Sequence, residues 1–152
     1  MARALEEVSL ATVAPDERVE GKLIALVSGF LLGSTAATVV TDRRILVQRL
    51  KNSGKPKGEA VVIDRAGIAT FAVKNFATLT EGSVDRDWRD AVLTRGMSGS
   101  FIVDLTTGDG KRLELTVTFG EGGLLGLMGP PSIQIEGAAA LLHALRLVER
   151  AA

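Results

Sequence analysis

The clearest pattern in the 152-residue chain is an alternation of apolar and polar side chains over residues 101–106, repeated over residues 112–119. A period of two predicts β-strands with one face buried and one face in water. The two segments are joined by Gly-Asp-Gly at 108–110, which favours a hairpin turn because Asp-Gly tolerates positive φ angles. The sequence therefore predicts an antiparallel hairpin here.

Five further strands are expected before this hairpin, and a helix after it. A short break at 65–67 separates the last two of these strands, which are predicted in order over residues 19–28, 34–41, 44–51, 59–64 and 68–74. Over residues 136–150 the apolar positions recur at helical spacing instead, which predicts an amphipathic helix with one apolar stripe. That stripe consists of Ala138, Leu141, Leu142, Leu145 and Val148.

These elements indicate a mainly-β fold, a seven-stranded antiparallel β-barrel or bent sandwich capped by a C-terminal amphipathic helix. The helix would cover an open end of the sheet with its apolar stripe. We expect one domain over residues 15–152, preceded by an arm or short helix at 1–14. Residues 75–98 form an insertion that fits either a short helix or an irregular excursion.

Two short motifs resemble those of a known domain family. They are Ala-Pro-Asp-Glu-Arg-Val at residues 14–19 and the segment 37–47, with Thr-Asp-Arg-Arg at 41–44. The first is similar to the opening, and the second to one hairpin, of the bacterial PH-like (pleckstrin-homology-like) domain family. The resemblance covers residues 15–150. It implies a β-barrel closed by a helix and a domain that often assembles as an oligomer.

The Thr-Asp-Arg-Arg sequence also has a local structural interpretation. Thr41 would end a strand, and Asp42 would accept hydrogen bonds from nearby backbone N–H groups. Arg43 or Arg44 would pair with a carboxylate across the turn. We therefore interpret this sequence as structural rather than ligand-binding.

Composition and spacing argue against an enzyme. The chain has no cysteine, no tyrosine and one histidine, so it has no disulfide, thiolate nucleophile or cysteine-ligated metal. His143 is expected at the surface, beside the apolar stripe of the helix. The segments at 85–90, 96–100 and 120–126 depart from the calcium-loop, nucleophile-elbow and phosphate-loop patterns. We predict a non-enzymatic protein with no catalytic residue, no metal and no cofactor.

Charge is balanced over the chain but not along it. Lysine and arginine together number 18, as do aspartate and glutamate, yet residues 42–57 hold six basic residues and one acidic residue. A basic loop is predicted at the end of this window, formed by Arg49, Lys51, Lys55 and Lys57. No aromatic residue is interleaved with it, which argues against a nucleic-acid partner.

Two glycine-flanked apolar segments complete the candidate binding surface. Loops normally face solvent, so apolar side chains within them need a partner. The candidates are Phe30, Leu31, Leu32, Leu124, Leu125, Leu127 and Met128. The PH resemblance places the first segment beside the basic loop. Two functions stay open: a protein-interaction or assembly module, with a protein partner or a homo-oligomer, and peripheral binding to an anionic membrane surface.

Residues 23–41 are uncharged and almost long enough to span a membrane as a helix. Their second half is small and β-branched, however, so two strands are predicted there instead. The N-terminus lacks the apolar region of a secretory signal. The expected location is the cytoplasm, with membrane association as the alternative.

Overall fold

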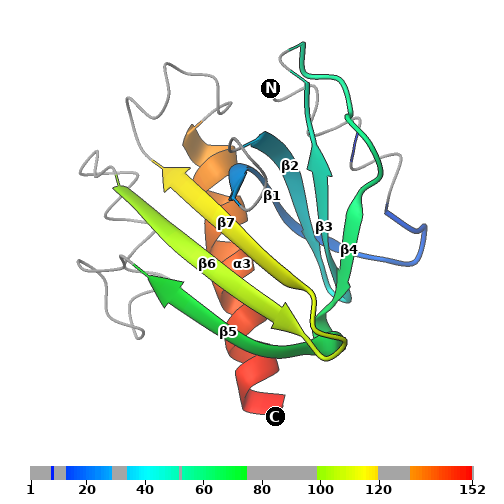
Figure 1. The fold of residues 1–152 in the computed structure, drawn as a ribbon, viewed down its shortest axis with the longest axis vertical. Helices are drawn as coiled ribbons and strands as arrows, with labels where there is room; N and C mark the ends of the chain where they lie inside the picture. Colours follow the sequence, from blue (N-terminus) through cyan, green and yellow to red (C-terminus); the bar gives the residue numbers. More distant parts are fainter. Residues whose placement is uncertain are drawn as a thin grey trace.

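The computed structural model describes Val8 and residues 13–28, 34–51, 53–74, 99–119 and 131–151. This part of the chain forms one antiparallel sheet in the order β4-β3-β2-β1-β7-β6-β5 (Figure 1). Its strands are β1 (Val19–Ser28), β2 (Ser34–Thr41), β3 (Arg44–Arg49), β4 (Val61–Asp64), β5 (Ile68–Lys74), β6 (Gly99–Thr107) and β7 (Arg112–Phe119). The C-terminal helix, α3, spans Pro131–Ala151. The predicted fold class, a mainly-β bent sandwich of seven antiparallel strands with a C-terminal helix, is confirmed.

The sheet is bent rather than closed into a barrel. Strands β4 and β5 are the two ends of the strand order, so they do not pair with each other. The 3-10 helix η1 (Arg65–Gly67), at the predicted break, turns the chain from one edge strand to the other. In Figure 1, β5, β6 and β7 lie in front of α3, and β2, β3 and β4 lie to their right.

Helix α3 packs mainly against β1 and β7 at very short range. A side chain at Gly137 would place its Cβ 2.1 Å from the carbonyl oxygen of Lys22, so only glycine permits this approach. Gly21 faces Ala140 at similarly short range. Four residues of the predicted apolar stripe lie buried in the main core: Ala138, Leu141, Leu142 and Leu145.

The helix begins five residues earlier than the sequence predicts, because Pro131 starts it rather than leading out of a loop. Proline suits the first turn of a helix, where its missing N–H is not needed. In that early turn, Gln134 donates to the carbonyl oxygens of Ile24 at 2.6 Å and Thr118 at 2.9 Å, and accepts from Ile24 N at 2.9 Å. This amide satisfies backbone groups just where the β1–β7 ladder ends, at Ala25.

The first three strands are apolar on both faces. Their inner face joins α3 in the main core, while a second cluster covers the outer face and includes Val8 from the N-terminal arm. That outer cluster consists of Val8, Ile24, Ala37, Val39, Leu46 and Leu50. Burial on both sides explains why residues 23–27 and 35–41 carry no charge. Among the described helices, none is long and apolar enough to cross a membrane.

The β3–β4 connection is longer than predicted, because the ladder breaks near Gln48. Lys57 N donates to Arg49 O, and the next pair is Val47 with Val61, so residues 58–60 stand opposite Gln48 alone. The Gln48 side chain donates to the carbonyl oxygens of Arg49, Lys57 and Gly58, replacing the lost ladder.

Candidate functional site

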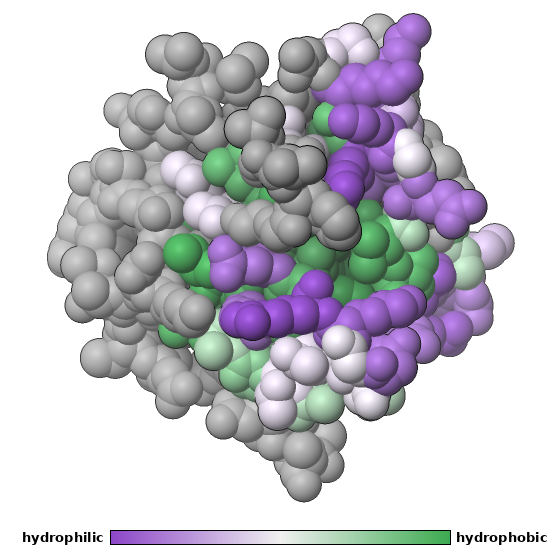
Figure 2. All heavy atoms as spheres, viewed as in Figure 1, coloured by the Kyte–Doolittle hydropathy of each residue, from purple (hydrophilic) through white to green (hydrophobic). Residues whose placement is uncertain are grey.

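A cleft of about 570 Å³ opens between β4 and the β6–β7 hairpin. Figure 2 shows it as a hollow with hydrophobic side chains inside and hydrophilic side chains along its border. Thirteen residues line it: Val27, Arg49, Val61, Val62, Ile63, Asp64, Gly67, Thr107, Gly108, Asp109, Lys111, Arg112 and Leu113. The lining therefore comes from β1, β3, β4, η1 and both sides of the hairpin.

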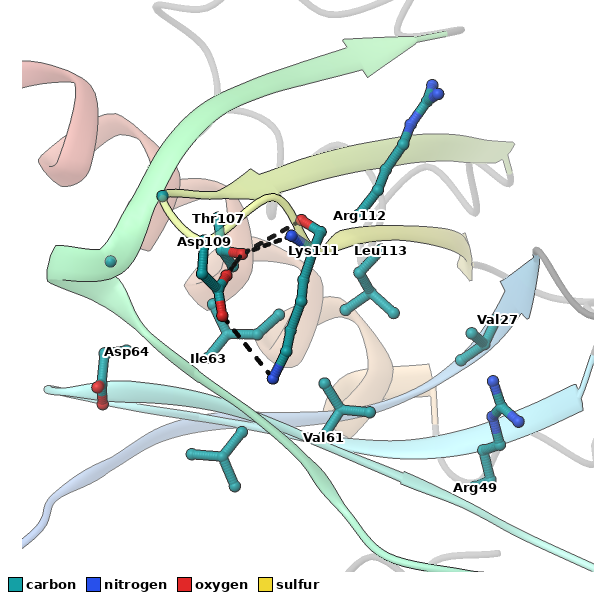
Figure 3. Close-up of a pocket in the computed structure, with 13 residues that line it drawn as sticks. Val27, Arg49, Val61, Ile63, Asp64, Thr107, Asp109, Lys111, Arg112 and Leu113 are labelled. Atoms are coloured by element: carbon teal, nitrogen blue, oxygen red, sulfur yellow. Dashed lines mark hydrogen bonds and ion pairs between the residues drawn. The ribbon is translucent and has the colours of Figure 1, made fainter.

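The floor of the cleft is an outward continuation of the main core. Side chains alternate along a strand, so Val61 shares the inner face of β4 with Ile63, which is 4% exposed. Val61 itself is 37% exposed. In Figure 3, Val61, Val27 and Leu113 point toward the same space from three different strands. The apolar interior is thus open to solvent at this point.

Strand β4 also exposes apolar surface on its other face, where Val62 is 49% exposed. Val61 and Val62 are the exposed large hydrophobic residues of the described part of the chain, and they are adjacent. Both lie on an edge strand. Exposed β-branched residues on an unpaired edge favour contact with another chain.

The opposite wall is a hairpin held firmly in place. Gly108 N donates to Gly67 O at 2.9 Å, which ties the turn to η1. The Thr107 hydroxyl donates to Asp109, and this bond is the main cause that lowers the pKa of Asp109. Gly110 has φ of 90°, which confirms the predicted Asp-Gly turn. These bonds fix the turn of the hairpin against η1.

Charged side chains border the apolar floor. Lys111 extends between the hairpin and β4 and lies 3.9 Å from Asp109 (Figure 3). Arg112 points away from the cleft in this view and pairs with Asp104 through bonds of 2.5 and 3.0 Å. Arg49 lines the cleft from β3. Besides Arg112, two basic side chains, Arg49 and Lys111, and two acidic ones, Asp64 and Asp109, line the cleft.

The predicted basic loop adjoins this cleft. Lys51, Lys55 and Lys57 are exposed, and Arg49 is half-buried. The loop is ordered by backbone bonds, including Lys51 N to Lys55 O at 2.8 Å, and by the Gln48 side chain. The structure thus brings Arg49, a predicted site residue, into the cleft, and the three lysines of the loop that follows it are not among the lining residues.

The predicted apolar loops lie outside the residues that the structure describes: Phe30, Leu31, Leu32, Leu124, Leu125, Leu127 and Met128. The 75–98 insertion lies outside them as well. The interpretation of these segments as a binding surface stays a prediction.

The Thr-Asp-Arg-Arg sequence is structural, as predicted. Arg43 pairs with Asp16 at 2.8 Å, and Arg44 forms an ion pair with Glu17, whose side chain is 2% exposed. The Arg44 hydrogen bond is the main cause that lowers the pKa of Glu17 to about 2. Asp42 accepts from the backbone N–H of Arg18 rather than from the turn itself.

Thr41 is the centre of this network. Its fully buried hydroxyl donates to Glu17 at 2.7 Å and accepts from the backbone N–H groups of Arg43 and Arg44 at 3.2 and 2.9 Å. Its carbonyl oxygen accepts from Arg65, which also pairs with Glu20 at 2.6 Å. These contacts join β1, β2, β3 and η1, so their role is to hold the fold.

Potential metal ligands do not gather in the described residues. Those residues contain no group of three or more potential metal ligands among His, Cys, Asp and Glu. His143 is half-buried on α3, not exposed as predicted, and it has an interaction partner. It is not among the residues that line the cleft.

Comparison with known proteins adds no assignment: no family model matches the chain, and a search of curated proteins found no match. Sequence reasoning missed the cleft as a site. The adjacent valines next to the basic loop were the signal in the sequence, whereas the four-residue length of β4 comes from the structure. A four-residue strand is typical of a sheet edge, where apolar residues on both faces are unusual.

Proposed function

We propose that this chain is a non-enzymatic, PH-like protein-interaction module that binds a segment of a partner protein in the cleft beside β4. The observation that carries the proposal is the exposure of Val61 and Val62, 37% and 49%, on an edge strand that borders a preformed hollow. Apolar floors with a few polar border groups are typical of binding sites. The tethered hairpin supports binding without large rearrangement.

A selection from a random twelve-residue peptide library against the full chain tests this function. Peptides that emerge are then measured on two variants, Val61→Asp in the cleft and Thr70→Asp on the exposed face of β5. A carboxylate on the apolar floor should weaken binding at least tenfold, whereas the change on β5 should leave it within twofold. Failure to select any peptide, or equal loss on both variants, would contradict the proposal.

A second candidate function is peripheral attachment to an anionic membrane surface. The exposed side chains of Lys51, Lys55 and Lys57 favour it, because each basic residue near such a surface contributes about 1 kcal/mol. Sedimentation with phosphatidylserine vesicles at low and high salt tests it. Binding should be released by salt and abolished when the three lysines are replaced by serine. Binding that survives either change would contradict this function.

A further inference from the structure

The open edge of β4 offers backbone groups as well as apolar side chains. We infer that the partner segment binds as an added β-strand along β4, and that this segment is extended, apolar at alternate positions and acidic at the end beside the basic loop. The inference rests on the proposed function and specifies its ligand. It follows from the register of β4, the size of the cleft and the charge around it.

The register shows which backbone groups of β4 are available. In an antiparallel ladder, residues alternate between directing both backbone groups toward the partner strand and directing both away from it. Arg65 N donates to Arg43 O, and Ile45 pairs with Ile63 in the same ladder. Ile63 and Val61 therefore direct their backbone N–H and C=O groups to β3, and Val62 and Asp64 direct theirs to the open edge.

The hydrogen bonds on the other side of β3, between β3 and β2, confirm this alternation. Leu50 N donates to Thr35 O on the β2 side, so the even-numbered residues of β3 bond to β2 and the odd-numbered residues bond to β4. Within the described residues, β4 has β3 as its sole paired neighbour. The Val62 N–H and C=O are thus directed to the same edge on which the Val62 side chain is half exposed.

The dimensions fit a short extended segment. At about 3.3 Å per residue, the four residues of β4 present roughly 13 Å of edge. A strand added there continues the sheet beside Val61 and Ile63, so every second side chain of the added segment faces the cleft. Backbone hydrogen bonds would give affinity, and the apolar floor would select the side chains.

Charge identifies the partner as acidic. Arg112 pairs with Asp104; apart from it, the cleft lining and residues 51–60 together hold five basic side chains and three acidic ones: Arg49, Lys51, Lys55, Lys57 and Lys111 against Glu59, Asp64 and Asp109. A second copy of the chain, pairing β4 with β4, would bring two such positive surfaces together. Like charges across an interface oppose association, so a carboxylate-bearing segment of another protein is favoured over self-pairing.

Replacing Val62 by proline tests the backbone contact. Because the Val62 N–H does not bond to β3, Val62→Pro should fold, and proline is tolerated at edge positions of this kind. Val62→Thr, which keeps the N–H and the branched shape, is the matched control. Selected peptides should carry alternating apolar residues and carboxylates, lose at least tenfold in affinity on Val62→Pro, and change less than threefold on Val62→Thr.

Methylation of the peptide backbone gives a test that does not depend on how the variants fold. Methylating one set of alternate amide nitrogens should abolish binding, while methylating the other set should leave it within threefold. Peptides that lose affinity on Val61→Asp but tolerate both Val62→Pro and methylation would overturn strand addition and leave the proposed function standing. A concentration-dependent dimer that Val62→Pro dissociates would show instead that a second copy occupies the edge. Vesicle binding lost on Val62→Pro would also overturn the inference.

Discussion

The basic residues at the two ends of β3 have different surroundings. At its start, Arg43 and Arg44 are held by Asp16 and Glu17. Beyond its end, the lysines of the basic loop are exposed: Lys51, Lys55 and Lys57. One uninterrupted basic window of the sequence therefore contains two kinds of cation. Arginines that meet carboxylates from the preceding segment hold the fold, and lysines on a surface loop stay available for a partner.

Burial also differs between the two ends of β3: polar groups are buried near its start, and apolar side chains are exposed near its end. At the first end, the Thr41 hydroxyl and the Arg65 guanidinium are buried within a network that joins four elements. At the second end, Val61 and Val62 are exposed on an edge strand. This arrangement suits a binding module, because the network at the first end holds β3, and β3 pairs with β4, the strand that carries the site. Mutations should therefore separate stability from binding.

The largest loss of stability is expected for Arg65→Ala. It removes a guanidinium that is 10% exposed and leaves Glu20 and the Thr41 carbonyl without their partner. Breaking one side of a buried ion pair costs about 3–5 kcal/mol. Urea denaturation followed by circular dichroism measures the free energy of unfolding.

The matched control is Arg43→Ala. The Arg43–Asp16 pair is exposed, with side chains 56% and 67% accessible, so its loss should cost less than about 1 kcal/mol. Similar losses for the two variants would contradict the distinction between a buried network and a surface pair.

A smaller loss is expected for Thr41→Val, which removes the hydroxyl at the centre of the network. The backbone N–H groups of Arg43 and Arg44 lose an acceptor, at a cost of about 2 kcal/mol. Thr38 on the same strand is the control, since its buried hydroxyl has no hydrogen-bond partner within the described structure. Thr38→Val should be neutral or stabilising, and thermal unfolding of both variants checks the contrast.

Acid should weaken the same network. The pKa of Glu17 falls from 4.5 to about 2 in the folded chain, so its carboxylate contributes stability that is present above pH 4.5 and lost as the pH falls toward 2. Urea denaturation at pH 6 and pH 2.5 should show a larger loss for wild type than for Glu17→Gln. Equal losses would show that Glu17 is not linked to folding.

Most of the fold could be predicted from local sequence patterns. The bounds of β1, β2 and β5 agree with the sequence prediction, because alternation and glycine-bounded ends specify them within a few residues. The start of α3 and the break in the β3–β4 ladder depended on long-range contacts. Gln134 reaches Ile24 across 110 residues, and no local pattern indicates such a contact.

The cleft was less predictable than the basic loop next to it. The lysines form a charge pattern within seven residues of sequence, whereas Val27, Val61 and Leu113 come from three separate segments. In the sequence, Val61 has the pattern of a buried strand residue. Its exposure depends on where the sheet stops, and that is a property of the assembled fold.

The smallest effect on stability is expected where the effect on binding should be large. Replacing Lys51, Lys55 and Lys57 together by serine changes exposed side chains, so the free energy of unfolding should change by less than about 0.5 kcal/mol per site. Binding of an acidic peptide should weaken at least tenfold at low salt, and the difference should shrink as salt screens the charges. Isothermal titration calorimetry at 50 and 500 mM salt measures the affinity at both salt concentrations, and urea denaturation measures the free energy of unfolding. A triple variant that unfolds as readily as Arg65→Ala would mean that the loop holds the fold, and that the two ends of β3 do not differ in role.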